Sequence, residues 1–113
     1  MSKRSMINKT SSVHDLQIEL LQDQQTAAAY LKVALDEYQE DGNTEVFLLA
    51  LRNVAEARGG IGKLAQKTHL NRQSLYQTLS SRGNPRLDTL GKVLLALGFH
   101  LSIEAINDTY EAA

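Results

Sequence analysis

The chain has 113 residues, of which 42% are apolar, and this length predicts a single domain with a compact core. It contains no cysteine, which excludes disulfides and thiolate metal sites and is typical of the reducing cytoplasm, where we expect this protein. We expect no signal peptide, and the apolar runs are far shorter than the roughly 20 residues of a membrane span.

The net charge of −1 is distributed unevenly along the chain. Residues 1–10 carry three basic residues, residues 11–58 carry three basic and nine acidic residues, and residues 59–103 carry six basic residues and one acidic residue. Acidic residues are absent from 59 to 87. One half of the molecule is therefore suited to a polyanion, whereas the other can face solvent or a basic partner.

The N-terminal third predicts an arm followed by a helix. Residues 1–12 lack periodicity, so we expect a flexible arm. Residues 13–22 fit either a strand or a helical face, and both alternatives stay open. From Asp23, a good helix cap, a stripe of apolar residues at helical spacing predicts a helix that ends near residue 42. Its members are Ala27, Leu31, Ala34, Leu35 and Tyr38, and we interpret Tyr30 and Tyr38 as core residues.

A second long helix is predicted over residues 45–58, with Asn43 or Thr44 as its cap. This helix should be central to the core because its apolar face is wide. The residues of that face are Phe47, Leu48, Ala50, Leu51, Val54 and Ala55. Gly59, Gly60 and Gly62 then permit a tight bend.

The C-terminal half predicts three further helices and a strand. Two short helices, 61–68 and 72–80, flank a turn, and Asn71 is a good cap for the second. After a loop, a helix is predicted over about 87–97, with leucines and Val93 at helical spacing and Gly98 at its end. Phe99, Leu101 and Ile103 then alternate with polar residues, as in a strand. A lone strand needs a partner, and we expect it from a second copy of the chain.

Residues 61–80 have the features of a helix-turn-helix. Leu64, Leu70 and Leu75 supply apolar contacts, and Ala65 is the small residue that lets the two helices approach. The outward face of the second helix carries Arg, Gln and Asn, which make bidentate hydrogen bonds to base edges. The residues predicted to contact bases are Asn71, Arg72, Gln73, Ser74, Tyr76 and Gln77, and those predicted to contact phosphates are Lys63, Lys67, Arg82 and Arg86.

The motifs LNRQSLYQTLS, GNPRLDTLGKVLLALG and LSIEA, together with the upstream AAAYLKVALDE and FLLALRNVAEARGG, resemble the HigA-like antitoxins, or addiction-module antidote proteins. These belong to the phage-repressor-like (XRE/Cro-type) helix-turn-helix class, and the resemblance covers about residues 13–106. It implies an all-α, lambda-repressor-like domain, which we expect to have five helices and a short C-terminal strand, followed by a tail at 107–113. The sequence departs from the pattern at His69, where the turn usually has Gly, and at Gln73 and Thr78.

The resemblance also implies a function in two parts. A homodimer would repress its own operon from operator DNA, and the protein would neutralise a small RelE/ParE-like toxin. Such toxins are commonly basic, so the acidic segment 11–58 is a candidate contact surface, although charge runs usually serve only solvation. Two rival hypotheses are a stand-alone phage-type repressor without a toxin and a helical protein-interaction module.

No pattern indicates catalysis, a cofactor or a metal. His14, His69 and His100 lack the spacing of metal ligands. The glycines at 59–62 precede no phosphate-loop signature, and no nucleophile elbow is present. We therefore expect a protein that is not an enzyme.

Overall fold

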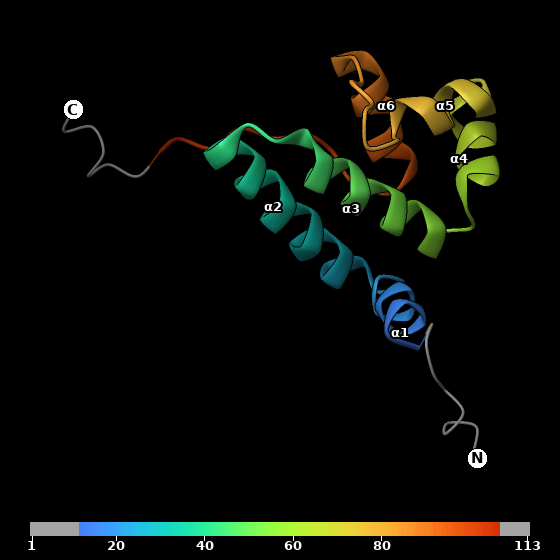
Figure 1. Ribbon diagram of the computed structural model, residues 1–113, viewed down its shortest axis with the longest axis horizontal. Coiled ribbons are helices and arrows are strands. Elements are labelled where there is room, and N and C mark those ends of the chain that lie inside the picture. Colours follow the sequence, from blue (N-terminus) through green and yellow to red (C-terminus); the bar gives the residue numbers. More distant parts are fainter. Residues whose placement is uncertain (1–11, 107–113) are drawn as a thin grey trace.

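The computed structural model describes residues 12–106, and this part of the chain forms six helices (Figure 1). In chain order they are α1 (Ser12–Leu20), α2 (Gln24–Asp41), α3 (Thr44–Ala57), α4 (Ile61–Thr68), α5 (Arg72–Thr78) and α6 (Leu87–Ala96). The all-α class is confirmed. The expected number of five helices is wrong, because residues 13–22, which the sequence left open between strand and helix, form most of α1 and the turn after it.

The predicted boundaries of the terminal segments fall close to the ends of the described region. The arm was expected over residues 1–12, but Ser12 is the first residue of α1. The remainder of the arm, and the tail at 107–113, lie outside the described residues.

Side chains cap the two long helices as the sequence predicts. Asp23 accepts a hydrogen bond from the Thr26 N–H at 2.9 Å at the start of α2, and Asn43 accepts one from the Glu45 N–H at 2.9 Å at the start of α3. Each cap satisfies an N–H that has no partner within the helix. Gly42 ends α2 in the left-handed conformation.

Helix α3 is the centre of the core, as expected from its wide apolar face. It packs against α1, α2 and α4, and all six of its predicted core residues are buried. Ala27, Leu31 and Ala34 of α2 are also buried. The core assignment of Tyr38 is wrong, since its side chain is 37% exposed; Tyr30 is half-buried and accepts a hydrogen bond from Asn53 Nδ2 at 2.8 Å.

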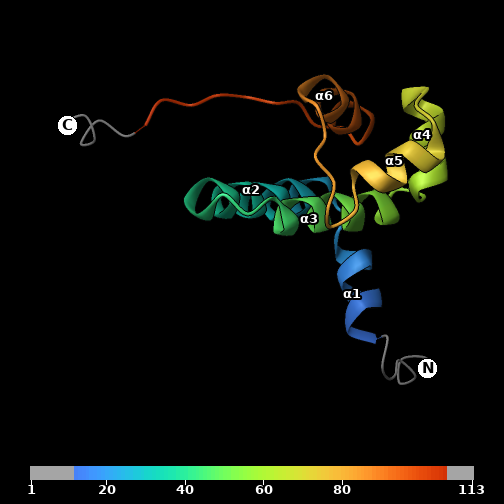
Figure 2. The ribbon, with the colours of Figure 1, turned by 45° about the horizontal axis from the view of Figure 1, so that its top comes forward.

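The helices divide into two groups around α3. Helices α2 and α3 lie side by side, and α1 projects from the end of this pair (Figures 1 and 2). Helices α4, α5 and α6 form the second group, in which α4 packs against both of the others and against α3. Among residues 12–106, no helix is both long and apolar enough to cross a membrane.

The predicted C-terminal strand is wrong for the isolated chain. Residues 99–106 have no regular secondary structure, and residues 12–106 contain no strand. The period-two alternation predicts a strand, but a strand is defined by hydrogen bonds to a neighbour, and the described part of the single chain supplies none at residues 99–106.

Candidate nucleic-acid interface

Helices α4 and α5, joined by a short turn, occupy the residues that the sequence predicts as a helix-turn-helix. Ala65 and Leu64 of α4 and Leu75 of α5 are buried, and Leu70 of the turn packs partly buried against the same core. His69 adopts the left-handed conformation, with φ of 60°, which residues other than glycine rarely adopt. Its N–H donates to the Ala65 carbonyl, so this residue ends α4 and begins the turn.

Helix α5 is short and is held at both ends. Asn71 Oδ1 accepts a hydrogen bond from the Ser74 N–H at 2.9 Å, which caps the helix as predicted. Leu75 and Leu79 are buried beneath it, and the guanidinium of Arg52 on α3 donates to the carbonyl of Leu79. A cation at the C-terminal end of a helix is favourable because the last carbonyls carry partial negative charge. Helix α5 therefore sits in a fixed orientation against α4 and is tied to α3 through Arg52.

The outer face of α5 is open to solvent. All six residues predicted to contact bases are exposed, namely Asn71, Arg72, Gln73, Ser74, Tyr76 and Gln77. Had this side been packed inside the molecule, it could not enter a groove. The structure therefore leaves the predicted contact residues accessible together on one short helix and its cap.

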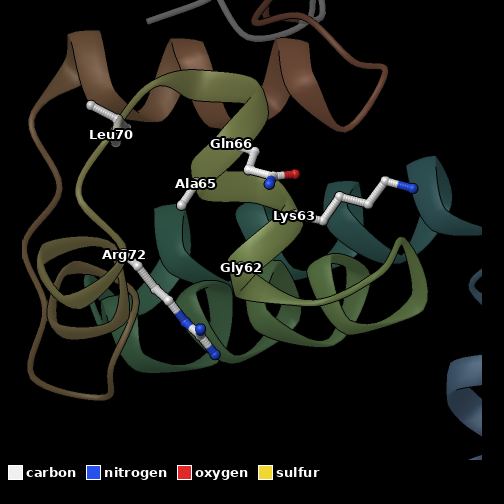
Figure 3. A pocket seen from close by; sticks show the side chains of 6 residues that line it. All are labelled: Gly62, Lys63, Ala65, Gln66, Leu70 and Arg72. Carbon is white, nitrogen blue, oxygen red and sulfur yellow. The ribbon is translucent and has the colours of Figure 1, made fainter.

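Arg72 differs from its neighbours in where its guanidinium lies. A Cβ built on Gly62 would lie 3.6 Å from Arg72 Cζ, so the guanidinium packs beside the first turn of α4. Figure 3 shows Arg72 reaching back from α5 toward α4, whereas Lys63 and Gln66 project away from it. These residues line a shallow depression between the two helices. Arg72 thus links the start of α4 to the start of α5.

The loop after α5 approaches the helix so closely that its turn requires glycine. A Cβ at Gly83 would lie 1.8 Å from the carbonyl oxygen of Thr78, which no real structure tolerates. The Gly83 N–H donates to the Ser80 carbonyl at 2.9 Å and closes the turn. This contact fixes where the chain that carries Arg82 leaves α5.

Exposed cations surround the helix pair. Lys63, Lys67, Arg82 and Arg86, the predicted phosphate contacts, are all exposed. Arg86 also pairs with Asp88, at 3.2 Å from Nε to Oδ1. The hydrogen bond from Arg86, helped by one from the Thr89 N–H, lowers the pKa of Asp88 below its usual value. Asp88 therefore stays ionised and offsets part of the charge of Arg86, which leaves the other three as stronger phosphate candidates.

The opposite group of helices has the reverse charge at its surface. All nine acidic residues of 11–58 are exposed. Of the three basic residues there, Arg52 and Arg58 are half-buried and bond to the carbonyls that end α5 and α6, at Leu79 and Leu97. Only Lys32 is exposed, and its Nζ lies 3.6 Å from Asp36. The surface of α1–α3 is thus more acidic than its composition indicates.

Helix α1 also carries an apolar stripe that no other described residue covers. Its side toward α3 includes the buried Leu21 just beyond its end and a contact from His14 Nε2 to Glu56 at 3.3 Å. Val13, Leu16 and Leu20 lie at helical spacing on another side and are exposed. Asp15 and Glu19 lie beside this stripe on the helix surface. The sequence allows a helical face with Leu16 and Leu20 as one of two alternatives, but it does not indicate that this face is left exposed.

The two inward arginines were also missed. The guanidinium of Arg58 lies 5.9 Å from the centre of the Phe99 ring and donates to the Leu97 carbonyl at 3.3 Å. No periodicity signals such a contact, because the partners are 39 residues apart. As for metal sites, the described part of the chain contains no group of three or more candidate ligands.

Comparison with known proteins gives two matches. The model of a family described as "Probable addiction module antidote protein" matches residues 12–105. An uncharacterized protein of Haemophilus influenzae is 32% identical over 79 residues, which are 70% of this chain and 80% of the relative. No solved structure matches the chain.

Proposed function

The chain belongs to the family of addiction-module antidote proteins, and from this premise we propose that it is a DNA-binding antitoxin that represses its own operon. Membership of this family supports an antitoxin role and implies a toxin partner. The DNA-binding half rests on one observation: the exposed face of α5 bears guanidinium, amide and hydroxyl groups, and no acidic residue occurs between 59 and 87. An exposed helix in an ordinary bundle normally mixes acidic and basic residues.

In this proposal α5 enters the major groove of operator DNA. Gln73 and Gln77 suit adenine, since a carboxamide can donate and accept at the same base edge, and Arg72 suits guanine. Tyr76 is placed to meet a phosphate or a thymine methyl group. Lys63, Lys67 and Arg82 position the domain through phosphates without reading sequence.

A homodimer would place two copies of α5 about one DNA turn apart, at roughly 34 Å, and would read a two-fold symmetric operator. Each subunit contributes one short recognition helix, so doubling the contacts supplies the specificity that one helix lacks. The operator is expected within the promoter of the protein's own operon.

The experiment for this half is a salt titration of binding to that promoter. The logarithm of the affinity should fall linearly with the logarithm of salt concentration, and the promoter should compete better than scrambled duplexes throughout. Binding with no preference between duplexes would reduce the proposal to non-specific attraction. An absence of binding at low salt would refute it.

For the antitoxin half, we place the toxin contact on the outer side of α1 and α2. This surface combines exposed carboxylates with the stripe Val13, Leu16 and Leu20, and a buried apolar centre inside a charged rim is the anatomy of a protein interface. Its charge fits a basic partner. The surface lies on a different helix group from α5, so both ligands can bind at once.

The second experiment uses the small protein encoded next to this chain in its module. Leu16→Asp should weaken binding of that protein at least about tenfold, because a charge would enter the centre of the interface. Leu95→Asp, at another exposed leucine on α6, should leave it unchanged. Equal effects of the two variants would remove α1 from the interface, and no binding by the unaltered chain would refute the toxin half without touching the DNA half.

A further inference from the structure

The segment from Phe99 to Ile106 leaves α6 in a fixed direction. The Phe99 N–H donates to the Leu94 carbonyl at 2.8 Å, and Gln24 Nε2 donates to the Gly98 carbonyl at 3.0 Å. Arg58 stacks over the Phe99 ring. Figure 2 shows the segment running from α6 along the same direction as α2. The start of the segment is therefore anchored to α2, α3 and α6.

Beyond this anchor the segment is exposed, and its backbone pairs with no other residue of 12–106. Residues 101–106 are all exposed, and Ile103 is 96% exposed. Within the described part of the chain, Phe99 alone of residues 99–106 has a backbone hydrogen bond. An extended backbone with free N–H and C=O groups is a template for pairing with another strand.

The segment also borders an apolar groove. About 480 Å³ of space lies between it and α2. Leu31 and Leu35 of α2, Phe47 of α3 and Leu94 of α6 supply the apolar part of the lining. A surface that carries both an open strand edge and apolar side chains is incomplete in a single copy.

The order of residues in the segment identifies what completes it. If two copies of the segment run antiparallel about a two-fold axis at Ser102, His100 of each lies opposite Glu104 of the other, and Leu101 lies opposite Ile103. Phe99 then lies opposite Ala105, a large residue against a small one. Cross-strand pairs of this kind stabilise antiparallel sheets, and every pair here is complementary in charge, polarity or size. Centring the axis one residue earlier would lose the pairing of His100 with Glu104.

We propose that two copies of this chain dimerise by pairing residues 99–105 as antiparallel strands centred on Ser102. Phe99, Leu101 and Ile103 of both copies share one side of the two-stranded ribbon, where Leu101 of each copy covers Ile103 of the other, a residue that is 96% exposed in the single copy. His100, Ser102 and Glu104 share the other side. The proposal rests on the dimer of the proposed function and specifies its interface. It also explains why a sequence with strand alternation forms no strand in one copy.

The first test is the mass of the full chain in sedimentation equilibrium, with and without Ile103→Asp. Ile103 is almost fully exposed in the single copy, so this substitution should spare the fold, which circular dichroism would check. It should raise the dimer dissociation constant about tenfold or more, because it affects two symmetric pairs. The control is Leu95→Asp, at a leucine that is 67% exposed on α6, and it should leave the constant unchanged.

The second test uses the absence of natural cysteines in the chain. Residues directly opposite in an antiparallel pair have Cα atoms about 4.5–5.5 Å apart, within the range that a disulfide spans. Ser102→Cys should therefore give a covalent dimer under mild oxidation, whereas Ser81→Cys, in an exposed loop, should not.

The third test checks the register by exchanging charges. His100→Glu should weaken the dimer, because it places two glutamates opposite each other, and the double variant His100→Glu with Glu104→His should restore it.

The outcomes separate the interface from the dimer itself. A wild-type chain that sediments as a monomer would overturn both the dimer and its strand interface. The salt titration of DNA binding tests a separate claim and is not affected by this result. A dimer that persists unchanged in Ile103→Asp would overturn the strand pairing alone. If Ser102→Cys did not cross-link in a preparation that is dimeric, the register would be wrong.

Discussion

Helices α1 and α5 are both short and both expose one side to solvent, yet the two exposed sides differ in chemistry. Helix α5 presents Arg, Gln and Asn with no carboxylate nearby, whereas α1 presents Val13, Leu16 and Leu20 beside carboxylates. Arg52 and Arg58 increase this difference, because their guanidinium groups bond to backbone carbonyls and do not neutralise the exposed carboxylates of α1–α3. One core therefore supports a surface suited to a polyanion and a surface suited to a basic, partly apolar protein.

The largest effect is expected from Leu51→Ala, because α3 underlies both surfaces. Leu51 is fully buried, and removal of a buried leucine side chain costs about 2–5 kcal/mol of unfolding free energy. Binding of DNA and of toxin should fall together as the folded fraction falls. Urea denaturation measures the loss, and Leu95→Ala, at a leucine that is 67% exposed, is the control. A loss of one activity alone would mean that the two surfaces do not share this core.

Arg72→Ala should separate base reading from phosphate binding. It should reduce discrimination at one base pair by about 1–3 kcal/mol, whereas Lys67→Ala should weaken all duplexes similarly and reduce the salt dependence by about one ion. Competition between operator and scrambled duplexes measures both quantities. If Arg72→Ala changed neither affinity nor preference, its assignment to base contact would be wrong.

The two asparagine caps provide a matched pair for the same comparison. Asn71→Ala and Asn43→Ala each remove a side-chain bond to a helix N–H and should each lower the unfolding free energy by about 1 kcal/mol. Only Asn71→Ala should also weaken DNA binding, because Asn43 lies in the acidic half. Equal DNA affinity of the two variants would exclude a direct role for the α5 cap.

The smallest effect concerns acid stability. The hydrogen bond from the Thr26 N–H lowers the pKa of Asp23 below its usual value of 3.8. Because the pKa of Asp23 is lower in the folded chain than in the unfolded chain, its ionised carboxylate adds to the free energy of unfolding at pH values above 3.8. This contribution is lost as the pH falls through the lowered pKa of the folded chain. Asp23→Asn keeps a capping oxygen without the charge, so its urea midpoint should decline less with falling pH than that of the unaltered chain. If the urea midpoints of the two proteins fell in parallel with pH, the Asp23 cap would not contribute to acid unfolding.

Much of this architecture can be predicted from local sequence. The caps Asp23, Asn43 and Asn71 and the apolar spacing of α3 located helices to within a few residues, because capping and helical periodicity are local properties. The exposed face of α5 followed from Leu75, whose burial sets the orientation of the helix.

The rest depends on partners that are distant along the chain or absent from it. The sequence shows Arg52 and Arg58 only as part of the charge of residues 11–58, and it is the packed structure that brings them to the carbonyls of Leu79 and Leu97. Tyr38 was misassigned because it lies at the end of α2, where the helical stripe runs beyond the core. Residues 99–103 showed strand alternation, but alternation describes side chains and does not supply a neighbouring strand.

The claim that α5 reads DNA sequence is tested most directly by letting the protein select duplexes from a random pool. We expect the unaltered chain to enrich one two-fold symmetric site with half-sites about one turn apart, and we expect Gln73→Ala and Gln77→Ala each to relax the preference at a different position of the half-site. Enrichment of the same sequence by all three proteins, or no enrichment by the unaltered chain, would contradict it.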